Sequence, residues 1–137
     1  MNVGLFPSFI RDAIDKGVIS LDDVLDDYEP FEAFRVASSK NISNGKPSKV
    51  DFKCQMELHD IRALANPEDR GFYGCSCCTD RELLDSMMKL PRRNKVVCKG
   101  CIRSIDGPVD SLEGHVNWFL YENAHPEDAF RVIDDGN

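Results

Sequence analysis

Two closely spaced cysteine pairs constrain the fold of this chain more than any other feature. The first pair is Cys75 and Cys78, the second is Cys98 and Cys101, and nineteen residues separate the pairs. This C-x2-C spacing, used twice, is typical of a zinc ion held by four thiolates. A zinc ion with four protein ligands has no open position for water or substrate. The sequence therefore predicts one structural Zn2+ that holds the fold and performs no chemistry.

Three further residues are alternative zinc ligands. Cys77 lies inside the first pair, and Cys54 and His59 precede it. Cys77 replaces Cys78 in one alternative, whereas Cys54 and His59 belong to a second zinc site that needs two more ligands. We expect instead that the spare cysteines are buried as small apolar side chains. A disulfide framework is the other alternative, although six cysteines without a secretion signal favour reduced thiols.

The composition is that of a globular protein. The chain has 137 residues, of which 42% are hydrophobic and 30% charged, which is consistent with one domain or one domain with a small appendage. No apolar run is long enough to span a membrane, and the first residues lack the charged leader and apolar stretch of a signal peptide. We therefore expect an intracellular protein, cytoplasmic or nuclear, in a reducing compartment and without a membrane partner.

The charges are distributed unevenly along the chain. The net charge is -7, yet residues 89–103 contain six cations and no acid: Lys89, Arg92, Arg93, Lys95, Lys99 and Arg103. These cations either offset the negative charge of zinc-bound thiolates or contact phosphates or an acidic protein surface. Residues 12–32 hold eight acids against Lys16 alone. This acidic stretch is either a solvated face or a docking patch for a basic protein.

Helical signals dominate the N-terminal segment. Pro7 or Ser8 begins a helix that Gly17 ends, and Ser20 caps a second helix with an apolar stripe through Tyr28. A third short helix is predicted after Pro30. We expect residues 1–38 to form an acidic helical segment and residues 39–48, which are polar and contain Asn-Gly and Pro, to form a linker or loop.

The remaining residues, 49–137, are predicted to form the zinc-binding module with a C-terminal helix. Thr79 or Asp80 caps a helix that reaches about Leu90, a brief strand follows at Val96, and Ser111 caps a last helix through Leu120. The predicted fold class is α+β, mainly α: a small helical part and a zinc-ribbon or treble-clef-like module, which together form one compact domain or two units.

A family resemblance follows from the same cysteines. Residues 71–105 resemble the zinc-ribbon and treble-clef class, and Tyr73-Gly74, the two cysteine pairs and Pro91 resemble zinc-finger regulators of bacterial RNA polymerase of the TraR/DksA type. The spacer between the pairs is longer here, and no long N-terminal coiled coil precedes them. The resemblance therefore implies a setting in transcription and not membership of the family.

No motif of an enzyme is visible. The sequence has no Gly-rich phosphate loop, no Gly-x-Ser-x-Gly and no His-Glu-x-x-His. We therefore expect a non-enzymatic zinc-binding adaptor or regulator that binds a protein partner in transcription or replication machinery. The alternatives are direct DNA or RNA binding through residues 89–103, a structural component of a larger particle, and a nuclease-like enzyme whose site we do not recognise.

Overall fold

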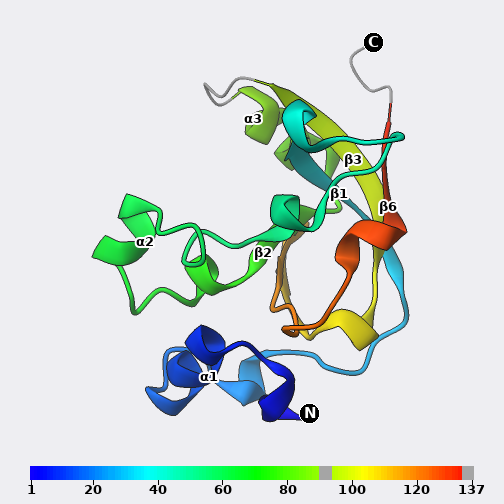
Figure 1. Cartoon of the computed structure of the whole chain (residues 1–137). Coiled ribbons are helices and arrows are strands. Elements are labelled where there is room, and N and C mark those ends of the chain that lie inside the picture. Colours follow the sequence, from blue (N-terminus) through cyan, green and yellow to red (C-terminus); the bar gives the residue numbers. More distant parts are fainter. Residues whose placement is uncertain (90–93, 134–137) are drawn as a thin grey trace.

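The computed structural model describes residues 1–89 and 94–133, except for the side chains of Met87 and Lys89. Within these residues, six strands form one antiparallel sheet in the order β4-β5-β2-β1-β3-β6 (Figure 1). The strands are β1 (Phe31–Ser38), β2 (Cys75–Cys78), β3 (Lys95–Ile102), β4 (Val109–Leu112), β5 (His115–Trp118) and β6 (Phe130–Val132). The prediction of a mainly α fold is therefore wrong.

Helices are short and lie around this sheet. The α-helices are α1 (Ser8–Asp15), α2 (Ile61–Ala65) and α3 (Arg81–Lys89). The 3-10 turns are η1 (Val3–Leu5), η2 (Leu21–Asp23), η3 (Ser39–Asn41), η4 (Lys49–Phe52), η5 (Arg70–Tyr73), η6 (Ser104–Asp106) and η7 (Pro126–Ala129). The predicted helices after Pro7 and after Thr79 are confirmed as α1 and α3. The helix predicted from Ser20 to Tyr28 is wrong, because only the three residues of η2 are helical there.

The helix predicted after Pro30 is instead the central strand β1. It pairs with β3 along its whole length, from Phe31 opposite Ile102 to Ser38 opposite Lys95, and with β2 on its other side. Buried, half-buried and exposed residues do not alternate regularly along β1, so it lacks the pattern of a half-exposed strand. Its apolar residues therefore resemble a short helical stripe in the sequence.

The predicted C-terminal helix is also wrong, because its residues form the hairpin β4–β5. Two residues, Glu113 and Gly114, connect the strands and have φ angles of 50° and 87°. Two consecutive positive φ angles are the geometry of a type I′ turn, whose twist matches that of the strands it joins. In the sequence, Glu113-Gly114 marks the position of this turn. The apolar residues on either side of it are neighbours across the two strands.

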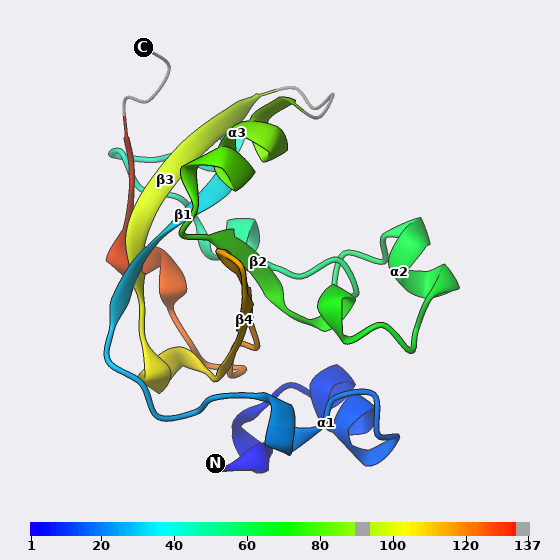
Figure 2. The ribbon, with the colours of Figure 1, turned by 180° about the vertical axis from the view of Figure 1, so that it is seen from behind.

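The two faces of the sheet have different covers. One face, which we call the core face, packs under η4 and η7 with Trp118, Phe52 and Phe130 at its centre. The opposite face, which we call the α3 face, packs against Leu84 of α3, and Figure 2 shows this helix lying against the sheet. A second cluster packs Phe6 and Ile10 of the N-terminal segment against Phe119, which directly follows β5. The sheet and the N-terminal helix therefore share apolar packing.

Candidate functional site

The four cysteines predicted to bind zinc lie in two strands that are not neighbours in the sheet. Cys75 and Cys78 are the ends of β2, Cys98 and Cys101 lie in β3, and β1 runs between the two strands. Neighbouring strands are about 4.8 Å apart, so β2 and β3 are separated by about 10 Å. Sulfurs bound to one zinc ion lie within about 4 Å of one another, because each Zn–S bond is about 2.3 Å long.

The spacing within each pair also turns the sulfurs apart. Side chains alternate between the faces of a sheet, so residues three apart in one strand face opposite sides. Cys75 and Cys98 belong to the cluster on the core face, whereas Cys78 packs with Val36 and Val97 on the α3 face. The two-residue spacing brings sulfurs together only in a tight loop, and here extended strands take the place of that loop.

The residues present therefore do not fit a four-thiolate zinc site. Within residues 1–89 and 94–133, no group of three or more His, Cys, Asp or Glu side chains is placed to hold a metal ion. Cys77 and Cys54 are buried free thiols, and His59 is exposed on a different part of the surface. The prediction of a zinc finger is wrong. The resemblance to transcription regulators depended on the same cysteine pairs and loses its support.

A half-buried guanidinium, which the sequence did not indicate as special, lies beside these thiols. Arg35 of β1 donates to the main-chain oxygen of Asp51 from Nε at 2.9 Å and from Nη2 at 2.8 Å, and to that of Ser76 from Nη1 at 2.6 Å. Burial lowers the pKa of this guanidinium, but its interaction with the nearby Cys75 and Cys77 raises that pKa overall. β1 and β2 are paired only at Phe34 and Cys78. Arg35 thus fills the gap where the strands diverge and satisfies the free carbonyl of Ser76.

Burial determines the protonation of most of these thiols. It raises the pKa of Cys54 to about 12 and that of Cys98 to about 11. The pKa of Cys77 is also raised, because its thiol is hydrogen-bonded to Cys75 and buried, while the same hydrogen bond and the nearby Arg35 lower the pKa of Cys75. The thiolate is the form that binds metals and reacts. Cys54, Cys77 and Cys98 are therefore small apolar parts of the core.

One further polar contact involves residues that can act in catalysis. The Ser76 hydroxyl and Nε2 of His115 are 2.7 Å apart on neighbouring strands. A serine nucleophile also needs a third group that orients the histidine. Among the residues that the structure describes, no carboxylate contacts His115. The contact connects β2 and β5, and it does not by itself indicate a reaction.

The basic segment is engaged within the protein wherever its side chains are described. The contacts are Lys95 with the main-chain oxygen of Met88 at 3.2 Å, Lys99 with the Glu32 carboxylate at 3.6 Å, and Arg103 with the Asp106 carboxylate at 2.7 Å. The side chains of Lys89, Arg92 and Arg93 lie outside the described residues. Contact of residues 89–103 with phosphates or an acidic protein surface stays a prediction.

The acidic stretch at residues 12–32 is a solvent-exposed surface. All eight acids are exposed. Asp23 pairs with Arg70 at 2.9 Å, and Asp26 pairs with the N-terminal ammonium at 3.2 Å. In the described part of the chain, five of the eight have no ion-pair partner: Asp12, Asp15, Asp22, Asp27 and Glu29. Within the described residues, this surface therefore carries several carboxylates that no ion pair compensates.

Residues 54–69 form an arm that projects from the sheet, with α2 at its far end (Figures 1 and 2). Three large apolar side chains of the arm are exposed: Ile61 at 82%, Leu58 at 56% and Leu64 at 53%. They are spaced three residues apart, and Ile61 and Leu64 therefore lie on one side of α2. We call these three side chains the apolar ridge. At the base of the arm, the Met56 N–H donates to the Phe72 carbonyl at 2.9 Å.

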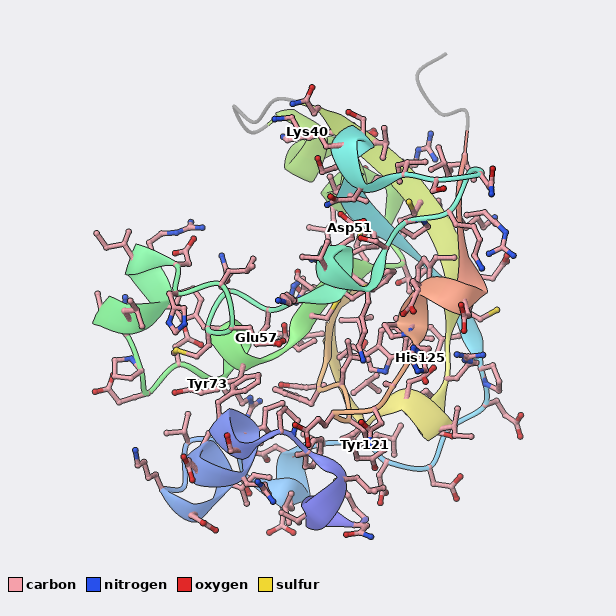
Figure 3. All side chains as sticks on the ribbon, in the orientation of Figure 1. Lys40, Asp51, Glu57, Tyr73, Tyr121 and His125 are labelled. Carbon is pink, nitrogen blue, oxygen red and sulfur yellow. The ribbon has the colours of Figure 1, made fainter. Side chains whose placement is uncertain are left out.

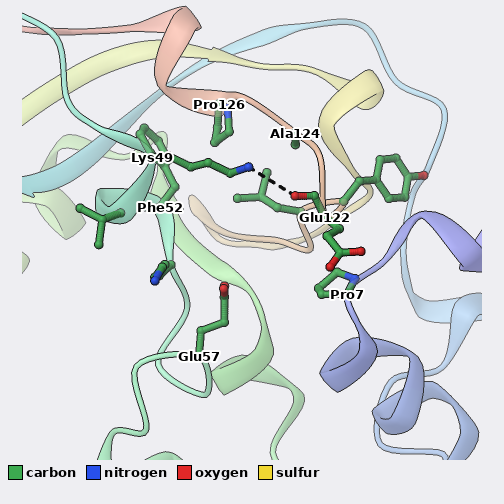
Figure 4. A pocket seen from close by; sticks show the side chains of 11 residues that line it. Pro7, Lys49, Phe52, Glu57, Glu122, Ala124 and Pro126 are labelled. Carbon is green, nitrogen blue, oxygen red and sulfur yellow. Dashed lines mark hydrogen bonds between the residues drawn. The ribbon is translucent and has the colours of Figure 1, made fainter.

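A pocket of about 300 Å³ lies at the base of the arm, between η4 and residues 120–126 (Figure 4). Its lining consists of Pro7, Lys49, Val50, Phe52, Lys53, Glu57, Leu120, Tyr121, Glu122, Ala124 and Pro126. Three segments that are distant in the sequence meet here. No spacing within any one of them indicates a pocket, so sequence reasoning missed it.

No family model, no curated protein and no solved structure matches this chain.

Among the helices that the structure describes, none combines the length and the apolar composition needed to cross a bilayer. The arm, the pocket and the acidic surface are therefore the features from which a function can be argued.

Proposed function

We propose that this chain is a non-enzymatic protein that docks onto another protein through the apolar ridge of its arm. The observation that carries the proposal is the exposure of Leu58, Ile61 and Leu64, above all the 82% exposure of Ile61. Exposed apolar patches mark interaction sites, whereas single exposed apolar residues are common, and here Ile61 and Leu64 lie on one side of α2.

The energy available from the ridge limits the kind of complex it forms. Burying one such side chain contributes about 1.5–3 kcal/mol. Three such contributions are of the same order as the cost of association, about 4–15 kcal/mol. The ridge alone therefore supports weak binding, and a tight complex needs further contacts.

The acidic surface is the best source of those contacts. It adjoins the base of the arm, because Arg70, which directly follows the arm, pairs with Asp23 of the acidic stretch. Uncompensated acids attract a basic partner and increase its association rate, an effect that salt reduces. The proposed partner is thus a protein with a basic surface and an apolar patch that covers Ile61.

Site-specific photo-crosslinking in the native cell tests this proposal. A photo-reactive residue is placed at position 61, and a matched one at position 105, because Ile105 is 78% exposed but lies outside the arm. We expect one partner protein to be crosslinked from position 61 and not from position 105, and in a cell extract the yield should fall as salt is added. The same products from both positions, or none from position 61, would contradict the proposal.

A further inference from the structure

The pocket at the base of the arm combines an apolar wall with separate positive and negative groups. Phe52, Leu120 and Pro126 are among its apolar lining residues. Its volume, about 300 Å³, is at the lower limit of pockets that bind small molecules. A ligand of that size has an apolar part comparable to one large amino-acid side chain.

The charged groups come from two sides. Lys49 extends from η4 across the pocket, and its Nζ donates to the main-chain oxygen of Glu122 at 3.3 Å (Figure 4). This contact uses one of the three donors of the ammonium group. Glu57 enters from the arm, and its Oε1 accepts the Cys54 N–H at 3.4 Å, which leaves Oε2 available.

These opposite charges do not neutralise one another. Lys49 and Lys53 line the pocket together with Glu57 and Glu122. In the described part of the chain, neither lysine forms an ion pair with either glutamate. An ammonium and a carboxylate are thus both available to a ligand that carries the complementary groups.

We propose that this pocket binds a zwitterionic ligand, namely an α-amino acid with a large apolar or aromatic side chain. The ligand carboxylate contacts the Lys49 ammonium, the ligand ammonium contacts the Glu57 carboxylate, and the side chain packs against Phe52 and Leu120. Charge-assisted hydrogen bonds are stronger than neutral ones, so each charged end contributes to specificity. The inference uses residues outside the apolar ridge and is independent of the docking proposal.

Matched ligands test the charge requirement in the full-length protein. Isothermal titration with L-phenylalanine measures binding of the zwitterion, whereas 3-phenylpropanoate lacks the ammonium and phenethylamine lacks the carboxylate. We expect L-phenylalanine to bind, each singly charged analogue to bind about tenfold more weakly, and glycine not to bind. Equal binding of all three aromatic ligands, or no binding of L-phenylalanine, would overturn the proposal.

Matched variants test the location. Lys49→Met removes the proposed carboxylate contact, and Lys40→Met is its control, because Lys40 is exposed and lies away from Glu57 in Figure 3. We expect K49M to weaken L-phenylalanine binding about tenfold while its affinity for phenethylamine stays unchanged. Glu57→Gln should show the converse, weakening L-phenylalanine but leaving 3-phenylpropanoate unaffected. Equal effects of K49M and K40M would place the ligand elsewhere.

Failure of this proposal is distinguishable from failure of the docking proposal. The triple variant Leu58→Ser, Ile61→Ser and Leu64→Ser alters the apolar ridge and no residue of the pocket lining. It should retain L-phenylalanine binding within about twofold of the unmodified chain, because no proposed ligand contact changes. Loss of that binding in the triple variant would show that the pocket does not act as an independent site.

Discussion

The sheet and the arm differ in how far their large side chains are buried. The sheet buries Trp118 and most of the cysteines and holds Arg35 half-buried, whereas the arm leaves Ile61 and Leu64 exposed to water. The conspicuous residues of the sequence therefore hold the fold. The residues on which we base the proposed docking function are aliphatic side chains at and beside a helix of five residues, and they form no sequence motif.

Replacing one large apolar residue in each region should give the largest difference in the free energy of unfolding. Trp118 is fully buried on the core face, so Trp118→Ala should lower the free energy of unfolding by about 3–5 kcal/mol. Ile61→Ala should change it by less than about 0.5 kcal/mol, because that side chain is already exposed. Urea denaturation measures both. Similar losses in the two variants would show that the arm is part of the core.

Arg35 provides a sharper test within the sheet. Arg35→Met keeps the apolar volume but leaves the carbonyls of Asp51 and Ser76 without their donor, which should cost about 2–4 kcal/mol. Arg131 is the matched control, since it stands in the same Phe-Arg-Val context in β6 but is exposed. Arg131→Met should cost less than about 1 kcal/mol in the same urea assay. If the two variants were equally stable, Arg35 would not be a structural group.

The protonation of the buried thiols predicts a loss of stability in alkali. Above pH 9, the ordinary thiol pKa of 9.0 is exceeded and the unfolded chain releases its thiol protons. The native state keeps the proton of Cys98 up to a pH of about 11 and that of Cys54 up to a pH of about 12, because these are their pKa values in the folded protein. Stability therefore falls as pH rises from about 9, by about 1.4 kcal/mol per pH unit for each retained proton. Below pH 9, both states hold the protons and these thiols add no pH dependence.

Denaturation at several pH values between 8 and 11 measures this slope, and Cys54→Ala isolates one thiol. The variant should show a shallower decline than the unmodified chain. An unchanged slope would mean that Cys54 is not a buried neutral thiol.

The smallest effect on stability is expected in the apolar ridge. Replacing Leu58, Ile61 and Leu64 with serine should change the free energy of unfolding by less than about 1 kcal/mol in total, because these side chains are already exposed. Thermal and urea unfolding measure it. A loss of several kcal/mol would show that the ridge packs within the protein and is not a free docking surface.

The two helices that the sequence predicted correctly, α1 and α3, have local start or stop signals that the structure uses. Asp80 starts α3, where its Oδ1 accepts the Glu82 N–H at 2.8 Å, and Gly17 follows α1 with a φ of 79°. Such signals act within a few residues and do not depend on the rest of the fold.

The elements that were missed depend on distant partners. β1 is a strand because β2 and β3 pair with its two edges, and the sequence of Phe31–Ser38 alone does not predict that pairing. Gly100 lies between the cysteines of the second pair, and a Cβ there would lie 2.2 Å from the Ala129 carbonyl oxygen. Close approach of residues 129–130 to β3 thus explains this glycine. The pocket was missed for the same reason, since its lining comes from three distant segments.

The two cysteine pairs are strand residues, and their sulfurs do not meet around one ion. Native mass spectrometry of the protein, expressed with zinc in the medium and purified without chelator, tests this arrangement. We expect the mass of the metal-free chain with six free thiols. One zinc ion per chain, retained in the unmodified protein and lost in Cys98→Ser, would show that the cysteine pairs do form a zinc site.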